Sequence, residues 1–429
     1  MSFDQGLSGL SAASEQLSVI GNNIANASTV GYKASDIQFS DVYANSLGGG
    51  GAAPVGIGVS SSAIAQQFTQ GSISTDNNPL DIAINGNGFF QLSTNGTVSY
   101  TRSGQFHLDA NGAIVTANGS NVQGYNANTS GVLSTGSTTN LVINAANLPP
   151  KVTSTVQTQL NLDSTSVKPI NAFNATDPTT YNYSNSVTVY DSLGNTHALQ
   201  TYYVQNGVSG VPAEDKWNVF ATLDGTQVIP APPVAGVPAG AVGQFSFNAS
   251  GALDSATSIL AASPPAPANT IALAMPLTNG ANALAVNVGF TGATQYGTIS
   301  GVNSQIQDGY ASGQLTQFSA GANGIITGTY SNGETQTLGQ VVLDNFVNPG
   351  GLKNAGNNQW YASAASGTPL LGTPGSGSLG TLQSSAVENS TTDLTSELVN
   401  MITAQQNYQA NAQTIKSQDQ ITQTLVTLR

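Results

Sequence analysis

The sequence predicts an α+β fold that is mainly β, in which paired N- and C-terminal α-helices form a coiled-coil-like stem and two or more β domains are inserted between them. Three observations lead to this prediction. Each end of the chain has one apolar stripe at helical spacing. The middle has short alternating apolar runs separated by Asn-Gly pairs, the strongest local signal for β-hairpins. The chain has 48 Gly and 18 Pro in 429 residues, yet neither occurs after Gly380.

Residues 1–30 are expected to form the N-terminal helix of the inner stem. Gly6, Gly9 and Gly21 interrupt this segment, and each should weaken an isolated helix by up to about 1 kcal/mol relative to Ala. The apolar positions nevertheless follow one another at steps of three and four, which is the spacing of a coiled-coil seam. The expected seam residues are Leu10, Ala13, Leu17, Ile20 and Ile24.

Residues 385–429 are expected to form the C-terminal helix of the stem. Ser390 to Asp393 suit an N-cap and an acidic first turn. Some 35 residues at about 1.5 Å each make a rod of roughly 50 Å. Two helices with one apolar stripe each most simply pair with each other, and the alternative is two unrelated helices packed on separate domains. The expected seam residues here are Leu394, Leu398, Met401, Tyr408, Ala412 and Ile415.

The segments between the helices are assigned by their turn and loop chemistry. Residues 31–71 include a Gly-rich stretch and are expected to be a linker or extended segment. Residues 72–145 and 306–384 have similar turns and are assigned to the first and second parts of an inner β domain, and residues 146–305 to an outer β domain. A chain whose ends pair must place its middle as loops that extend outward from the helical stem.

Composition excludes several classes of function. Lys and Arg number 8 against 21 Asp and Glu, and the formal net charge is −13. So few cations cannot neutralise a row of phosphates, so nucleic acid is not an expected partner. The chain has no Cys and two His, which excludes disulfides and thiolate chemistry and leaves little for a metal site. No run approaches the roughly 18 apolar residues of a membrane span, so membrane insertion is not expected either.

The N-terminal sequence bears on where the protein works. It has no basic segment before an apolar run, so a cleaved secretory signal is not expected. This alone favours the cytoplasm. Scarce Lys, absent Cys and abundant small polar residues are more typical of secreted surface proteins, so export without a cleaved signal stays open.

Motifs that could support catalysis are weak. Gly375 to Gly380 match G-x-G-x-x-G, but they lie in a low-complexity stretch that no predicted strand precedes, which favours a linker. His107 and His197 both lie in predicted strands, and no G-x-S-x-G elbow nominates a nucleophilic serine. The carboxylates are scattered rather than paired as a glycosidase requires. We therefore predict that the protein is not an enzyme, with no catalytic, cofactor-binding or metal residues.

Four segments, taken in order, resemble one known family. Residues 7–33 contain LSVIGNNIAN followed by GYK, residues 79–90 read PLDIAINGNGFF, residues 100–106 read YTRSGQF, and residues 394–421 form the fourth segment. This set resembles the axial proteins of the bacterial flagellum, and the stretches 189–197 and 313–346 resemble the hook proteins among them. The matching motif residues at the N-terminus are Gly21, Asn22, Asn23, Asn26, Gly31, Tyr32 and Lys33.

The resemblance implies a structural subunit that self-assembles into the flagellar hook, a flexible curved tube that acts as a universal joint and transmits torque from the motor and rod to the filament. The implied partners are copies of the same chain, the distal rod, the hook cap, the hook-filament junction proteins and the flagellar export apparatus. The implied location is extracellular, in the hook, after export without a cleaved signal, and no cofactor is implied. Phe3 and Leu7 resemble a short export signal of the family and could equally be the first seam residues.

Two alternatives stay open from sequence. The first is a distal rod or other hook-basal-body axial protein, which would share the chain ends. The second is a secreted β-rich adhesin, for which an aromatic groove and a cell-wall or membrane anchor would be expected. The terminal helices should also remain largely disordered until assembly, because a free monomer offers them little to pack against.

Overall fold

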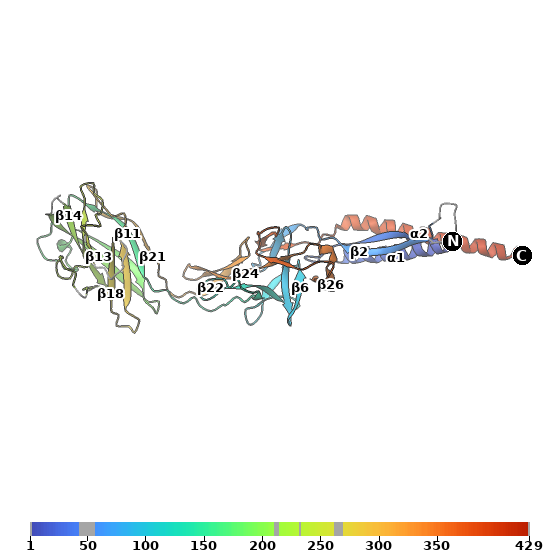
Figure 1. The fold of residues 1–429 in the computed structure, drawn as a ribbon, viewed down its shortest axis with the longest axis horizontal. Coiled ribbons are helices and arrows are strands. Elements are labelled where there is room, and N and C mark those ends of the chain that lie inside the picture. The colour runs from blue at the N-terminus through green and yellow to red at the C-terminus, as the bar shows by residue number, and fades with distance from the viewer. Residues whose placement is uncertain (1, 43–55, 210–213, 231–232, 261–268, 428–429) are drawn as a thin grey trace. The chain divides into compact units, whose positions relative to one another are not determined.

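The computed structural model describes residues 2–42, 56–209, 214–230, 233–260 and 269–427. It separates into two compact units. The first unit contains Met1–Ala145, Thr316–Thr329 and Thr335–Arg429, and the second contains Ala146–Leu315 and Tyr330–Glu334. The described residues are mainly β, with one α-helix near each end and the β domains between them (Figure 1). At this level the predicted fold class is confirmed.

The two helices are α1 (Ser2–Ala25) and α2 (Leu394–Thr427), and they pack against each other. Asp393 caps α2, because its Oδ1 accepts hydrogen bonds from the backbone nitrogens of Thr395 and Ser396 at 2.9 and 3.4 Å. The N-terminal helix ends at Ala25 rather than at residue 30. The backbone nitrogen and the side-chain Nδ2 of Asn26 both donate to Asn22 O, at 3.1 and 2.9 Å, and the next backbone nitrogen, that of Ala27, bonds to Ile24 O in a tighter turn.

The segment predicted as a linker or extended segment contains a β-hairpin. β1 (Ser35–Val42) and β2 (Gly58–Gln66) pair antiparallel, with a bulge between Gln38 and Phe39, and both strands contact α1. Ile37 is buried, which gives the hairpin an apolar contact that sequence periodicity did not reveal. The Gly-rich residues 46–55 of the predicted linker lie outside the described residues.

The β domain of the first unit interleaves strands from both halves of the chain. β24 pairs with β9, β25 with β5, β27 with β6, β29 with β4 and β30 with β3. An aromatic cluster of Phe89, Tyr100, Phe346 and Trp360 lies in its core. The strands are β3 (Ile73–Thr75), β4 (Ile82–Asn85), β5 (Phe89–Thr94), β6 (Thr97–Thr101), β7 (Phe106–Leu108), β8 (Ile114–Thr116), β9 (Asn121–Asn126), β10 (Thr139–Asn140), β22 (Leu315–Ala320), β23 (Ile325–Tyr330), β24 (Thr335–Val341), β25 (Leu343–Asn345), β26 (Lys353–Gly356), β27 (Gln359–Tyr361), β28 (Leu370–Gly372), β29 (Thr381–Ser384) and β30 (Ala386–Glu388), with a 3₁₀ turn at Pro349–Gly351.

The second unit is a β sandwich. One sheet has the order β12-β13-β14-β16-β17 and the other β18-β19-β11-β20, with β15 and β21 paired at β14 and β11. Side chains of both sheets meet in one core, where Leu160, Tyr203, Trp217, Phe245 and Val286 are buried. The strands are β11 (Thr155–Asp163), β12 (Tyr183–Tyr190), β13 (Thr196–Ser209), β14 (Glu214–Leu223), β15 (Thr226–Gln227), β16 (Gly243–Phe247), β17 (Ile259–Leu260), β18 (Thr270–Met275), β19 (Leu284–Gly289), β20 (Thr294–Tyr296) and β21 (Gly301–Gln307), with a 3₁₀ turn at Pro178–Thr180.

Candidate assembly site on the helical stem

We define the stem as the described residues of 2–42, 56–69 and 389–427, which contain both helices and the β1–β2 hairpin. The helices run antiparallel, because Asn23 near the end of α1 contacts Glu397 near the start of α2, while Gly6 faces Ile415. A Cβ atom on Gly9 would lie 2.8 Å from the side chain of Asn411, and one on Gly6 would lie 3.0 Å from Cγ1 of Ile415. The glycines that weaken α1 as an isolated helix thus let α2 approach it closely.

The predicted seam residues occupy different environments. On α1, Ala13 and Ile20 are buried, and Leu10, Leu17 and Ile24 are half-buried. On α2, Met401, Ala412 and Ile415 are half-buried. Leu394, Leu398 and Tyr408 are exposed by 48%, 41% and 37%. The α2 contact that sequence reasoning missed is Ala404, which is fully buried; it continues the spacing from Met401, but its small side chain gives little apolar signal.

Apolar side chains also cover faces of the stem that nothing in the described chain packs against. Phe3 and Leu7 are about half exposed on α1, as are Phe39 and Ile64 on the hairpin. On α2 the exposed fraction runs from 41% to 72%, at Leu398, Val399, Ile402, Ile421 and Val426. Large apolar side chains exposed together on one element are typical of interaction sites.

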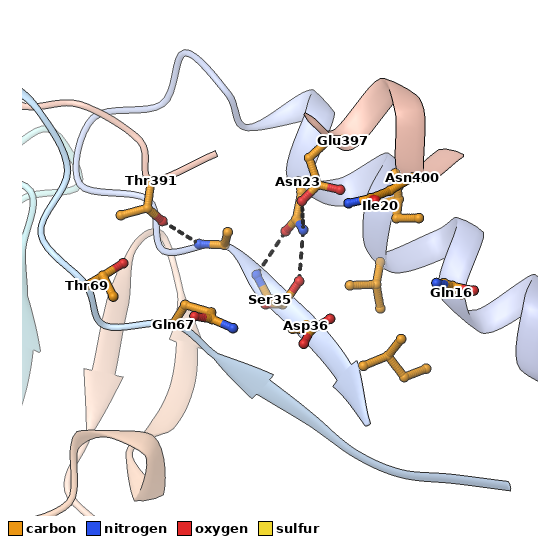
Figure 2. Close-up of a pocket in the computed structure, with 13 residues that line it drawn as sticks. Gln16, Ile20, Asn23, Ser35, Asp36, Gln67, Thr69, Thr391, Glu397 and Asn400 are labelled. Carbon is orange, nitrogen blue, oxygen red and sulfur yellow. Dashed lines mark hydrogen bonds between the residues drawn. The ribbon is translucent and has the colours of Figure 1, made fainter. Parts of the chain in front are cut away.

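The motif shared with the flagellar axial proteins forms the junction between α1 and β1. The side chain of Asn23 is buried, and its Nδ2 donates to Ser35 O at 2.8 Å and to Glu397 Oε1 at 2.9 Å. Its Oδ1 accepts from Ser35 N and from the Tyr32 hydroxyl. Figure 2 shows Asn23 between the strand and the two helices. One amide thus joins α1, β1 and α2, so its four hydrogen bonds are specific to this arrangement.

The remaining motif residues complete the turn. Asn22 Oδ1 accepts from Asn26 Nδ2 at 2.9 Å and from the Tyr32 hydroxyl at 3.2 Å. Burial raises the pKa of Tyr32, and the nearby Glu397 carboxylate adds to that shift. Gly31 has φ +70°, and a Cβ there would lie 2.6 Å from the backbone nitrogen of Ser103. Only glycine fits this close approach. Gly21, in contrast, has open space around it.

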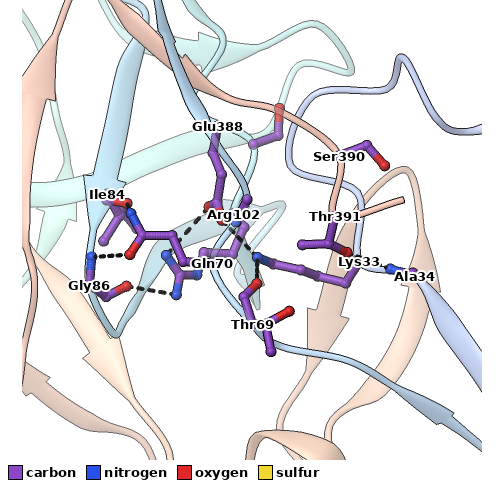
Figure 3. Close-up of polar contacts among 12 residues, drawn as sticks. Lys33, Ala34, Thr69, Gln70, Ile84, Gly86, Arg102, Glu388, Ser390 and Thr391 are labelled. Atoms are coloured by element: carbon purple, nitrogen blue, oxygen red, sulfur yellow. Dashed lines mark hydrogen bonds and ion pairs between the residues drawn. The ribbon is translucent and has the colours of Figure 1, made fainter. Parts of the chain in front are cut away.

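A buried ion cluster fixes the base of the stem. Lys33 Nζ lies 2.7 Å from Glu388 Oε1 and donates to Thr69 O, and Arg102 Nη1 lies 3.4 Å from Glu388 Oε2 (Figure 3). Burial lowers the pKa of both cations, and the Glu388 carboxylate opposes that shift. Arg102 also donates to Gly86 O and stacks 5.5 Å from the centre of the Phe89 ring. Two cations on one carboxylate thus join the segment between α1 and β1 to β30, the strand before α2.

Sequence reasoning identified Lys33 but not Glu388 or Arg102. Lys33 and Glu388 are 355 residues apart, so no local spacing links them. A signal was nevertheless present, because only eight cations occur in the chain and three of them, Lys33, Arg102 and Lys416, lie inside segments that resemble the family.

A polar recess lies beside Asn23, and we call it the stem recess. Its volume is about 370 Å³, and Figure 2 shows the side chains of α1, β1 and α2 that surround it. Asp36 and Glu397 contribute carboxylates, and the lining includes no Lys or Arg. The lining residues are Gln16, Val19, Ile20, Asn23, Ala34, Ser35, Asp36, Ile37, Gln67, Thr69, Thr391, Glu397 and Asn400.

The remaining candidates from the sequence are the Gly375–Gly380 motif and the two histidines. Gly375 and Gly380 close a turn, since Gly375 N donates to Gly380 O. His107 is exposed, and His197 lies between Asp191 and Asp224, with ring nitrogens 3.3 and 2.6 Å from their carboxylates. In the described ranges no three His, Cys, Asp or Glu side chains are grouped closely enough to hold a metal ion. Neither described helix combines the length and the apolar character that a membrane span requires.

Four family descriptions match successive parts of the chain. They are "Flagella basal body rod protein" at residues 3–33, "Flagellar hook protein FlgE/F/G D1 domain" at 83–166, "Flagellar basal body protein FlaE D2 domain" at 161–310, and "Flagellar basal body rod FlgEFG protein C-terminal" at 383–428. Two terminal helices with β domains between them, matched in this order, define an axial protein of the bacterial flagellum.

Full-length relatives specify the family more narrowly. The chain is 41% identical to the flagellar hook protein FlgE of Salmonella typhimurium and to that of Escherichia coli K12, over 100% of both chains in each comparison. It is 33% identical to the FlgE of Treponema pallidum, covering 100% of this chain and 99% of the other. The chain belongs to the flagellar hook protein FlgE family. It is a structural subunit of the hook, an extracellular structure, and not an enzyme, as predicted.

A solved structure agrees at the level of the fold. The crystal structure of Helicobacter pylori flagellar hook protein FlgE2 matches with a TM-score of 0.54 at 14% identity, covering 74% of this chain and 100% of the other.

Proposed function

We propose that this hook subunit polymerises by packing its coiled-coil-like stem against the stems of other copies, and that the β domains, residues 72–145 with 306–384 and residues 146–305, extend outward from it. The observation that carries the proposal is the series of exposed apolar side chains on α2, from Leu398 to Val426. Burial of this apolar surface in a polymer would stabilise the polymer by about 25 cal/mol for each Å² removed from water.

The stem residues divide into two roles in this proposal. The buried and half-buried positions, such as Ala13, Ile20 and Ile415, hold α1 to α2 within one chain. The exposed positions Leu394, Leu398 and Tyr408 contact neighbouring copies. A single apolar stripe can face either the other helix of the same chain or a neighbouring copy, but not both. Contact between copies therefore needs the second set of apolar positions.

The stem acquires its stability on assembly. α2 has 34 residues, yet Ala404 is the only one of its described side chains that is buried in a single chain. We therefore infer that both helices stay largely disordered in the free subunit and that the order begins at the Lys33–Glu388 cluster. Limited proteolysis of the monomer tests this: cleavage is expected within 1–30 and 390–429, and resistance of both segments would contradict it.

Disordered ends also suit export as an unfolded chain without a cleaved signal. Phe3 and Leu7 are both about half exposed and available to an export receptor. The proposed partners beyond the chain itself are the distal rod, the hook cap, the hook-filament junction proteins and the export apparatus. Replacing Phe3 and Leu7 with Ser should lower secretion; if they act only in the seam, polymerisation of purified subunits should suffer instead.

Electron microscopy of the purified subunit under polymerising conditions tests the central proposal. Curved tubes are expected. A variant with Leu398, Val399 and Ile402 changed to Gln should remain monomeric, while the same number of changes at exposed polar positions, Thr403, Gln406 and Gln409 to Ser, should polymerise normally. Straight filaments, or an inert wild-type monomer, would contradict the proposed assembly.

A further inference from the structure

The stem has an unequal distribution of charge. Of its two described cations, Lys33 is buried in the ion cluster, so Lys416 on α2 is the exposed one. When many stems pack side by side, carboxylates of neighbouring copies repel one another. One accessible cation on each stem can then stabilise the packing by attracting a carboxylate of its neighbour. Seven carboxylates lie in the described stem, on Asp4, Glu15, Asp36, Asp41, Asp393, Glu397 and Asp419.

Lys416 has no ion pair within its own chain among the described residues. Asp419 follows it by three residues, but its Oδ2 accepts a hydrogen bond from Gln423 Nε2 at 2.9 Å. The preceding residue, Ile415, packs toward Gly6, so this part of α2 is held against α1 while the Lys416 side chain lies in solvent.

The stem recess has the complementary chemistry. Its two ionisable lining groups are the carboxylates of Asp36 and Glu397, with the apolar side chains of Val19, Ile20 and Ile37 beside them. Asn23 occupies one oxygen of Glu397, and Asp36 is exposed. A lysine side chain combines an apolar chain of methylenes with a cationic end, which matches a recess of about 370 Å³ with this lining.

We propose that Lys416 of one copy inserts into the stem recess of a neighbouring copy and pairs there with Asp36 and Glu397. The inference rests on the proposed stem-to-stem assembly and adds the contact that sets its register. Within one chain the groups cannot meet, because Lys416 lies 19 residues, about 28 Å of helix, beyond Glu397.

The contact is directional. Each copy donates one lysine and accepts another, so donor and acceptor surfaces differ and the neighbouring stem is shifted by about 28 Å along the helix. A contact between two different surfaces does not close on itself as a two-fold dimer does, and its repetition generates an open filament. The pair thus supplies the register that apolar surfaces, which tolerate sliding, leave open.

Disulfide trapping tests the contact directly, because the chain has no Cys of its own. Single variants Asp36→Cys and Lys416→Cys are mixed in equal amounts, polymerised and oxidised. We expect covalent dimers in the polymer and none in the mixed monomers. The control replaces Asp36→Cys with Glu15→Cys, another exposed carboxylate position of the stem, and should give no dimers.

Charge reversal provides the second measurement. Lys416→Glu should lower the polymer yield at least tenfold, and adding Asp36→Lys in the same chain should restore it. A polymer without the 36–416 disulfide, equal trapping by Glu15→Cys, or a double variant no better than Lys416→Glu would each overturn the inference and leave the proposed assembly intact. A wild-type chain that forms no polymer would instead contradict the assembly, and with it the inference.

Discussion

The β sandwich and the stem bury their apolar side chains to very different extents. In the sandwich, Tyr203, Trp217 and Phe245 are all fully buried within one chain. In the stem, Leu398 and Ile402 remain about half exposed, although they belong to the longest element of the fold. The comparison shows that one region completes its core alone, while the other leaves large apolar side chains exposed, which we propose that copies of the chain cover.

The largest expected effect concerns the ion cluster at the base of the stem. Glu388→Ala leaves Lys33 and Arg102 buried without their carboxylate, which should destabilise the β domain of the first unit by about 3–5 kcal/mol. Urea unfolding monitored by Trp360 and Trp217, one in each unit, measures it, with Glu15→Ala as the exposed control. The sandwich transition should not move. An equal loss in both units would mean that they unfold together.

A second change separates the helix contact from helix propensity. Gly9→Leu should destabilise the α1–α2 contact by about 1–3 kcal/mol, because the larger side chain overpacks against Asn411, and the polymer yield should fall. A Cβ atom on Gly21 would have nothing within 4 Å, so Gly21→Leu should instead stabilise α1 by less than about 1 kcal/mol. Sedimentation of the polymers compares the two variants. Equal yields would show that the helices do not approach each other as described.

A third prediction perturbs the sandwich alone. Burial tends to lower the pKa of His197, but its hydrogen bonds to Asp224 and Asp191 outweigh burial and raise it above its usual value. The protonated ring can donate to both carboxylates, whereas the neutral ring can donate to only one.

Because the folded pKa is raised, this stabilisation is complete below the unfolded pKa of about 6.5 and is lost as pH rises through the folded pKa. The thermal unfolding temperature of the sandwich should therefore fall as pH rises through that window. His197→Gln should remove this fall, and His107→Gln should not. A decrease that persists in His197→Gln would assign it to another group.

The smallest expected effect tests why so few charges occur on the sandwich. We infer that neutral polar surfaces exchange hydrogen bonds at little net cost, which lets neighbouring copies slide as the hook bends. Ser184, Ser186 and Thr188 are changed to Lys in one batch of subunits and to Glu in another, and the two batches are polymerised together. Each new Lys–Glu pair should stabilise the contact between copies by about 0.2–1 kcal/mol. The mixed tubes should be stiffer in bending measurements. Stiffness equal to that of wild type would count against the inference.

Sequence reasoning worked where the signal was local. The steps from Leu10 to Ile24 and the cap at Asp393 both lie within a few residues, and α1 and α2 are found there. It did less well where partners are distant or small: Glu388 needs Lys33 from 355 residues away, and Ala404 has too little apolar surface to stand out. For residues 31–71 the sequence predicts a linker or extended segment, and the pairing of β1 with β2 within it depends on the register of two strands that are separated along the chain.

The pairing of β3 with β30 and of β4 with β29 has a consequence for how the chain matures. The β domain of the first unit needs strands that lie on both sides of the sandwich in sequence, and its closing ion pair spans 355 residues. A chain that emerges from its N-terminus can complete the sandwich early, but it cannot close this domain until Glu388 has emerged. A chain that stops before Glu388 therefore contains the whole sandwich but lacks a complete β30 and the carboxylate that pairs with Lys33 at the base of the stem.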